Sequence, residues 1–266
     1  MLSDKEFGIL LDRLNRPWAG YRKVRKGVKK RLRRHMLSIG CSTIEQYIEQ
    51  LNRQPEAKRA CEACLRVTIS RFFRDHQLWQ TMQTRILPSL LRQFEPPLRA
   101  WSAGCAGGEE PYTLAMVHCE AVIPARLNLL ATDASGHCLE RARIGIYTRN
   151  SLKELPDHLR EKYFQSQKGG RQFHLQSHRL PPVRWQRHDL LDAPPEPGPF
   201  GLILLRNNLL TYYRGAKRDT ALKGIISCLA AGGCLVTGSH EHLPASASVL
   251  TRDPQCPWVH WQGIPP

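Results

Sequence analysis

Beyond residue 97, short apolar runs alternate with stretches of helical character, and this alternation restricts the fold more than any other feature of the sequence. The apolar runs cover residues 98–104, 127–133, 200–205 and 233–238. Strands that are apolar on both faces are typical of a parallel sheet that helices cover on both sides. We therefore expect an α/β domain with a mostly parallel sheet over residues 98–266.

The residues before this region show helical periodicity only. Leu2, Phe7 and Leu10 recur at the spacing of one helix face, and no cluster of Gly or Pro interrupts the region. We expect residues 1–75 to form an all-α domain and residues 76–97 to form a linker helix.

One segment of the α/β region departs from the alternation. Residues 171–176 and 183–187 alternate in polarity as short strands do, and two glycines precede the first of them. The sequence predicts a small antiparallel β-subdomain inserted at about residues 163–188. The tail beyond residue 244 carries little pattern.

A dense basic run occupies residues 21–35. Val24, Val28 and Leu32 lie four residues apart and so share one helix face, while lysines and arginines cover the rest. The whole chain has a formal net charge of +16. A basic excess of this size predicts an acidic partner, which is nucleic acid, an anionic membrane or an acidic protein surface.

The cysteines and the absence of long apolar runs bear on the compartment. No run reaches the roughly 20 apolar residues that a membrane helix needs. The nine cysteines are scattered, many of them within apolar runs, as reduced thiols are. Cys61 and Cys64 have no second ligand pair, and His240 and His242 have no third ligand, so we predict no metal site. We expect a cytoplasmic protein without membrane insertion.

A glycine-rich loop follows the first predicted strand. Gly104, Gly107 and Gly108 lie where ligands bind in open parallel sheets, beyond the carboxyl end of a strand. Glu109 and Glu110 come next, and two acids would repel a pyrophosphate. The loop is neither a dinucleotide fingerprint nor a P-loop. It favours a cofactor with a cationic centre and no phosphate, such as S-adenosylmethionine.

An acid closes the second predicted strand. Asp133 can accept hydrogen bonds from two ribose hydroxyls, as acids at this position do in nucleotide sites. Dinucleotide sites use the same device, so Asp133 alone does not choose the cofactor. Together with the acidic first loop, it favours a nucleoside without a pyrophosphate.

Five segments in chain order resemble the CheR family, the glutamate O-methyltransferases of chemotaxis receptors (methyl-accepting chemotaxis proteins). They are TISRFFRD at residues 68–75, WSAGCAGGEEPYTLAM at 101–116, ATD at 131–133, LRNNLLTY at 205–212 and GGCLVTGSHE at 232–241. The resemblance implies a Rossmann-like S-adenosylmethionine-dependent methyltransferase domain, with an N-terminal all-α domain and an inserted antiparallel β-subdomain.

The resemblance also implies a set of cofactor contacts. Arg74 would bind the methionine carboxylate, Asp133 would hold the ribose, and Asp189 with Leu190 would flank the adenine. The full implied set is Thr68, Ser70, Arg74, Glu109, Asp133, Asp189, Leu190, Leu205 and Arg206.

The implied reaction is methyl transfer to a glutamate side chain, which gives a methyl ester and S-adenosylhomocysteine. The expected catalytic residues are Arg74, Arg206 and Tyr212. Thr211 stands where the family has a tyrosine, so either a neighbouring tyrosine substitutes or the substrate or rate differs. The alternatives are a non-catalytic or weakly active cofactor-binding regulator, and a methyltransferase that acts on another acidic protein or on nucleic acid.

In the family, the N-terminal domain faces the acidic methylation helices of the receptor. The residues expected to dock there are Lys23, Arg25, Lys26, Lys29, Lys30, Arg33 and Arg34. Aromatic side chains are sparse in the run, which weakens binding of single-stranded nucleic acid as an alternative. The short loop at residues 165–171 predicts no tight docking of a receptor's C-terminal pentapeptide.

Overall fold

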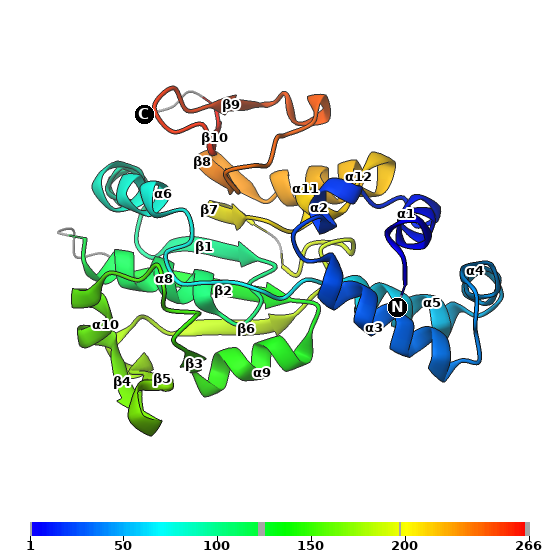
Figure 1. The fold of residues 1–266 in the computed structure, drawn as a ribbon. Coiled ribbons are helices and arrows are strands. Elements are labelled where there is room, and N and C mark those ends of the chain that lie inside the picture. The colour runs from blue at the N-terminus through cyan, green and yellow to red at the C-terminus, as the bar shows by residue number, and fades with distance from the viewer. Residues whose placement is uncertain (1, 122–125, 197, 264–266) are drawn as a thin grey trace. The chain divides into compact units, whose positions relative to one another are not determined.

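The computed structural model describes residues 2–121, 126–196 and 198–263 (Figure 1). The chain forms two compact units. One comprises Met1–Val67 with Leu210–Arg218, and the other comprises Thr68–Leu209 with Asp219–Pro266. The helical unit therefore ends before the expected boundary at residue 75, and a distant segment of the chain returns to it.

The helical unit forms around the apolar faces that the sequence predicts. Its helices are α1 (Asp4–Arg13), α2 (Trp18–Tyr21), α3 (Arg25–Ser38), α4 (Ile44–Arg53) and α5 (Pro55–Leu65). Phe7, Leu10, Val28 and Leu32 are fully buried in one core. Ser3 begins α1 with a capping box, because its side chain accepts the amide hydrogen of Glu6 while the Glu6 carboxylate accepts from Ser3.

The segment 210–218 packs within this helical unit through aromatic and cationic contacts. The ring centroids of Tyr21 and Tyr212 lie 5.1 Å apart. Arg16 donates to the Tyr212 carbonyl oxygen at 3.2 Å, and its guanidinium lies 3.6 Å from the centroid of the Tyr213 ring. The α11 helix (Leu209–Tyr212) and the residue after it thus contribute two tyrosines to the helical unit.

The second unit contains the predicted sheet, which has seven strands in the order β6-β2-β1-β7-β8-β10-β9. The strands are β1 (Leu98–Ala103), β2 (Leu127–Asp133), β6 (Val183–Arg187), β7 (Phe200–Leu205), β8 (Leu229–Thr237), β9 (Leu250–Arg252) and β10 (Val259–Gln262). The first five pair in parallel, which confirms the mostly parallel sheet. The tail adds the antiparallel strands β9 and β10, which the sequence did not suggest.

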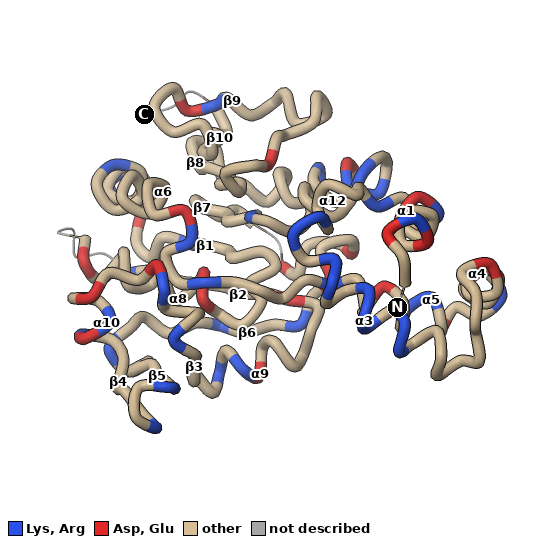
Figure 2. Tube along the Cα trace, in the orientation of Figure 1, with Lys and Arg blue, Asp and Glu red and all other residues tan. Residues whose placement is uncertain are grey.

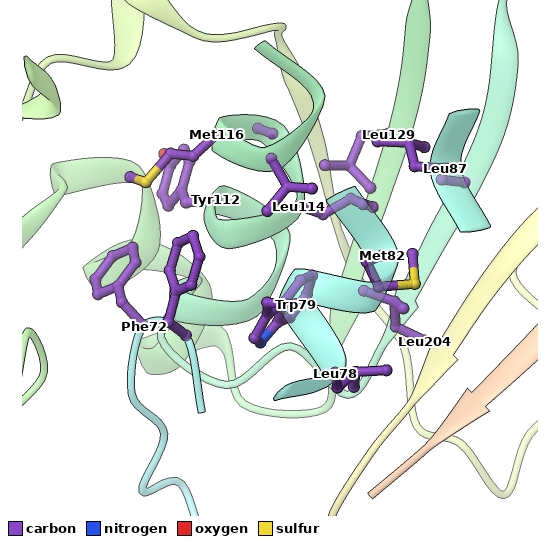
Figure 3. Packing of buried hydrophobic residues seen from close by; sticks show 14 of the residues in the cluster. Phe72, Leu78, Trp79, Met82, Leu87, Tyr112, Leu114, Met116, Leu129 and Leu204 are labelled. Atoms are coloured by element: carbon purple, nitrogen blue, oxygen red, sulfur yellow. The ribbon is translucent and has the colours of Figure 1, made fainter. Parts of the chain in front are cut away.

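Residues 76–93 are not a free linker but part of the core of this unit. They form α6 (His76–Thr81), a π-helical turn (Met82–Ile86) and α7 (Leu87–Gln93). Their apolar side chains, including Leu78, Trp79 and Met82, are buried beside Leu114, Leu129 and Leu204 (Figure 3). Leu114 belongs to α8 (Glu109–Cys119), which follows the glycine loop as predicted, and α9 (Gly136–Ile144) follows β2.

The inserted antiparallel sheet exists, and its strand β5 confirms the strand predicted at residues 171–176, but the other strands differ from the prediction. It contains β3 (Ile146–Thr148), β4 (Phe164–Gln167) and β5 (Gln172–Leu175), and α10 (Asp157–Tyr163) precedes β4. The stretch 183–187 lies instead at the edge of the main sheet, paired in parallel with β2. An edge strand with one exposed face shows the same alternation in polarity as a strand of a small antiparallel sheet, so the pattern did not separate the two.

The strand order also locates the edge of the sheet where ligands bind in folds of this kind. From β1 the chain adds β2 and β6 on one side, and then β7 and β8 on the other. Ligands bind at such a reversal, beyond the carboxyl ends of the strands. The remaining helix of the second half, α12 (Gly215–Ile226), connects β7 to β8 through α11. Within the described residues, no helix is long and apolar enough to cross a membrane.

Candidate cofactor site

The loop after β1 has a backbone that requires glycine at its first position. Gly104 has a φ of +82°, in the left-handed region. A Cβ at this position would lie 2.4 Å from the side-chain nitrogen of Asn208 and 3.3 Å from a methyl carbon of Leu190. The Asn208 amide donates to the Ala103 carbonyl oxygen at 2.6 Å. Residues after β1, β6 and β7 therefore meet at this loop.

Asp133, at the end of β2, ties this loop to the next turn. One carboxylate oxygen accepts the Ala106 amide hydrogen at 2.9 Å, and the other accepts from Ser135 at 2.8 Å. The side chain is half-buried. Because each carboxylate oxygen has more than one lone pair, both can accept a further hydroxyl hydrogen. The residue predicted to hold a ribose therefore has the right chemistry and a fixed orientation.

Asp189 and Leu190 follow β6 and are both half-buried. The Asp189 carboxylate accepts the amide hydrogen of Leu191 at 3.1 Å, which fixes the turn. Leu190 lies over Gly104, as described above. The structure thus brings Leu190, which was predicted to flank the adenine, to the glycine loop.

Arg74 lies in a turn that precedes α6, after the half-buried residues Thr68 and Ser70. Its carbonyl oxygen accepts hydrogen bonds from the Trp79 indole and from Arg206, both at 2.9 Å. Its half-buried guanidinium has no hydrogen-bond or ion-pair partner within the described part of the chain. A guanidinium in that state can bind a carboxylate in a bidentate manner.

Arg206, directly after β7, is buried, with 2% of its side chain exposed. It donates to Asp75 at 2.7 Å and to Glu110 at 3.1 Å, besides the Arg74 carbonyl. Glu110 also accepts from the Ser102 hydroxyl at 2.7 Å. Burial raises the pKa of the Glu110 carboxyl, while Arg206 and Ser102 oppose that shift. The prediction missed Asp75 and Glu110 as site residues.

Glu109, which we predicted to face the cofactor, is buried and forms an ion pair at 2.9 Å with the partly exposed Arg141 of α9. Its second carboxylate oxygen is buried without a hydrogen-bond partner among the described residues. Burial raises the pKa of Glu109, and the nearby Arg141 opposes the shift. Adjacent residues of a helix point about 100° apart, so one of the two acids joins Arg206 and the other Arg141. The sequence alone could not tell which.

The remaining predicted residues lie in two places. Leu205 is the last residue of β7, is fully buried and pairs with Thr237. Tyr212 belongs to the helical unit with Thr211. A Cβ on Gly20 would lie 2.3 Å from the Thr211 carbonyl oxygen, so only glycine permits this close approach. The catalytic role of Tyr212 stays a prediction.

Lysines and arginines are frequent along α3 and in the turn before it (Figure 2). Some of their side chains are exposed, and others contact the protein. Lys29 is buried and pairs with Asp4 at 2.7 Å, and Arg25 also contacts Asp4. Arg33 is half-buried and donates to the Ser42 carbonyl. Because Lys29 is buried and paired with Asp4, it does not belong to the exposed part of the predicted docking set. The exposed members are Lys23, Lys26, Lys30 and Arg34.

An open sheet with a glycine loop after its first strand and a fixed acid after its second is typical of enzymes that bind a nucleoside cofactor. Within that class, the acidic helix start after the loop and the guanidinium of Arg74 fit S-adenosylmethionine, the cofactor of a methyltransferase. Residues 68–256 match the family model described as CheR methyltransferase, SAM binding domain. The chain belongs to the CheR family, and it is a methyltransferase that uses S-adenosylmethionine. This confirms the cofactor and the family that the sequence predicted.

The chain aligns with most of the length of several curated relatives. A chemotaxis protein methyltransferase of Listeria monocytogenes is 31% identical over 226 residues, which is 84% of this chain and 85% of the relative. That of Listeria innocua is 35% identical over 187 residues, 70% of each chain. Chemotaxis protein methyltransferase 1 of Pseudomonas aeruginosa is 28% identical, with 81% of each chain covered.

Proposed function

We propose that this protein transfers methyl groups from S-adenosylmethionine to glutamate side chains of chemoreceptors in the cytoplasm, forming methyl esters. The observation that carries the proposal is the family match over residues 68–256. Within it, Arg74 offers a guanidinium that has no hydrogen-bond or ion-pair partner among the described residues, and Asp133 offers an oriented carboxylate. The relatives named as chemotaxis protein methyltransferases support the choice of substrate.

In this proposal each residue of the site binds one part of the cofactor. Arg74 binds the methionine carboxylate, because a guanidinium matches a carboxylate in charge and geometry. Asp133 accepts hydrogen bonds from the ribose hydroxyls, and Asp189 with Leu190 flanks the adenine. Thr68 and Ser70 belong to the same chain segment as Arg74 and would contact the cofactor from there.

The chemistry asks little of the protein beyond alignment. When bound, the cofactor supplies a methyl group on a positively charged sulfonium, which is a strong leaving group. The acceptor glutamate is ionised at neutral pH, so no general base is needed. The chain's own contribution is to orient the two reactants and to exclude water from the carboxylate. We assign the hydroxyl of Tyr212 to the acceptor side of the reaction.

Docking in this proposal relies on exposed cations of α3 and of the turn before it. Lys23, Lys26, Lys30 and Arg34 would attract the acidic helices of a receptor. Because these side chains have no partner in the described residues, they can approach an acidic surface without first breaking an ion pair.

The test is a transfer assay with tritiated S-adenosylmethionine. Chemoreceptor-containing membranes should acquire label that alkali releases as methanol, as expected for glutamate esters. Membranes whose receptors carry alanine at the methylated glutamates are the matched control and should stay unlabelled. Label that appears in added RNA instead, or that resists alkali, would contradict the proposal.

Two variants test the tyrosine assignment in the same assay. Tyr212→Phe keeps the ring that packs against Tyr21 but removes the hydroxyl, and it should lower kcat about 10-fold. Thr211→Tyr restores the family residue and should raise kcat or leave it unchanged. An unchanged kcat for Tyr212→Phe would remove Tyr212 from the mechanism without touching the cofactor assignment.

A further inference from the structure

We infer that Arg206 is a positioning residue, which acts on the cofactor's carboxylate through Arg74 instead of touching the reacting atoms. It holds the turn at residues 72–75 in a strained conformation, and so fixes the backbone from which the Arg74 guanidinium extends. The inference rests on the role proposed above for Arg74, and it assigns Arg206 a function different from that of a pocket-lining residue.

The turn around Arg74 is strained on both sides. Phe73 has a φ of +54° and Asp75 a φ of +65°, both in the left-handed region. Residues other than glycine rarely adopt this conformation, and a bulky residue such as Phe does so least readily. Such backbone persists only where the surroundings over-determine it, and it concentrates at functional sites.

Several hydrogen bonds hold the turn from different elements. The Phe72 amide donates to the Ser151 carbonyl at 2.9 Å, the Phe73 amide to the Thr113 hydroxyl at 3.2 Å, the Trp79 indole to the Arg74 carbonyl at 2.9 Å, and the Ser239 hydroxyl to Asp75 at 3.0 Å. Each of these bonds reaches one residue of the turn. Arg206 alone among the donors described here bonds two of them.

The same terminal nitrogen of Arg206 donates to the Arg74 carbonyl and to the Asp75 carboxylate, at 2.9 and 2.7 Å. Its other terminal nitrogen donates to Glu110 at 3.1 Å. Glu110 is bonded in turn to Ser102 of β1. The rigid guanidinium fork therefore links the turn to the ends of β1 and β7, which a lysine ammonium cannot do with the same geometry.

A second ion pair of the same unit provides a structural counterpart. Arg85 donates both terminal nitrogens to Asp253 at 2.9 and 2.7 Å, and the Asp253 side chain is fully buried. This pair joins the helical segment after α6 to the turn before β10, and it bonds none of the residues proposed to bind the cofactor. It matches the Arg206 pair in chemistry and also contains one buried partner, although that partner is the acid in place of the arginine, and it differs in what it holds.

Two ligands separate positioning from stability. S-adenosylhomocysteine carries the amino acid carboxylate, whereas 5′-methylthioadenosine shares the nucleoside and lacks the amino acid. In calorimetry, Arg206→Lys and Asp75→Asn should each lower the affinity for S-adenosylhomocysteine about 10-fold. The affinity for methylthioadenosine should change less than twofold. Asparagine tolerates the left-handed conformation, so Asp75→Asn keeps the backbone accessible if Arg206→Lys does not fold. The control Arg85→Lys should lower the thermal midpoint and leave both affinities within twofold.

A double-mutant cycle identifies the route of the effect. If Arg206 acts through Arg74, then Arg206→Lys in an Arg74→Ala background should change S-adenosylhomocysteine affinity less than twofold further. Additive losses, or equal losses for both ligands, would make Arg206 a structural residue and overturn the inference. If Arg74→Ala alone leaves S-adenosylhomocysteine affinity unchanged, the role proposed for Arg74 fails and the inference fails with it. Methylthioadenosine binding then still reports on the nucleoside site.

Discussion

The two units of the molecule use charge in opposite ways. Residues 1–67 and 210–218 contain 19 of the 39 lysines and arginines but only seven of the 23 acids, which leaves a formal charge of +12 there and +4 in the rest of the chain. In the helical unit, several α3 cations are exposed. In the other unit, buried acids such as Glu109, Glu110 and Asp253 contact arginines.

The exposed charges of the helical unit can attract a partner, whereas the buried charges of the other unit hold the fold together. Exposed charges act over distance and weaken with salt, and each one adds little to stability. A buried charge is costly unless it is paired, so the loss of one partner lowers the stability of the folded protein strongly. Substitutions in the methyltransferase unit should therefore produce large, localised losses, whereas those on α3 should produce graded losses that depend on ionic strength.

The largest expected effect belongs to the acid at the end of β2. Asp133→Ala removes the acceptor for the Ala106 and Ser135 amides and for the ribose, so S-adenosylhomocysteine affinity should fall about 100-fold or more. Calorimetry measures the loss. Asp157→Ala, at an exposed acid on α10, is the control and should bind normally. A loss below tenfold for Asp133→Ala would remove the ribose assignment.

A buried ion pair in the same unit should set part of its acid sensitivity. Burial alone would raise the pKa of the Asp253 carboxyl, but hydrogen bonds from Arg85, the Trp261 indole and two backbone amides lower it to about 2. A depressed folded-state pKa contributes stability above about pH 4, and that stability is lost as the pH falls toward 2. At neutral pH, Asp253→Asn should cost about 2 kcal/mol in chemical denaturation.

The difference between wild type and Asp253→Asn should shrink toward zero as the pH approaches 2. A constant difference across that range would show that the carboxyl titrates in the folded protein as it does when unfolded. Cofactor affinity at neutral pH should stay the same in the folded variant, because Asp253 bonds none of the residues proposed to bind it.

A smaller effect is expected from the exposed cations of α3 and of the turn before it. Reversal of Lys23, Lys30 and Arg34 to Glu should raise the KM for receptor membranes about 10-fold at low salt, with much less effect at high salt. S-adenosylhomocysteine affinity should not change. The matched control reverses three exposed cations of the other unit, Arg92, Lys153 and Lys223, and alters net charge equally. Equal KM values for the two triple variants would show that only overall charge matters.

The smallest effects concern two neighbouring lysines of α3, one expected to affect stability and the other receptor binding. Lys29→Ala removes a buried stem and the ion pair with Asp4, so it should cost about 1 kcal/mol of unfolding free energy without a change in receptor KM. Lys30→Ala should cost less than about 0.5 kcal/mol but raise the KM slightly. Denaturation curves measure the loss of stability of both variants, and methylation assays with receptor membranes measure their KM values. The opposite assignment of the two effects would return Lys29 to the docking face.

The sequence was most informative where local pattern and fold agree. The strands β1, β2, β7 and β8 were predictable because their apolar runs are long enough to mark buried strands by themselves. The Trp101–Tyr112 region and Asp133 indicated the cofactor because the residue types alone, acids and glycines, show which chemistry is possible there. Family resemblance then supplied Arg74, Asp189 and Leu190, which no periodicity marks.

What escaped prediction depends on partners that are far away in the chain. The stretch 183–187 looks the same whether it pairs with β5 or with β2, and only the tertiary fold decides. The choice between Glu109 and Glu110 depends on the positions of Arg141 and Arg206. Positive φ at Phe73 leaves no trace in the residue type, because it is imposed by contacts from outside the turn.

The return of residues 210–218 to the helical unit bears on how such a protein can be inherited and recombined. The chain passes between the units three times, at residues 67, 209 and 218. A gene exchange with a single crossover near residue 67 would separate Arg16 and Tyr21 from the tyrosines 212 and 213 that they contact. The helical unit is therefore not a detachable module, and its first helices must evolve together with a short stretch encoded some 190 codons downstream.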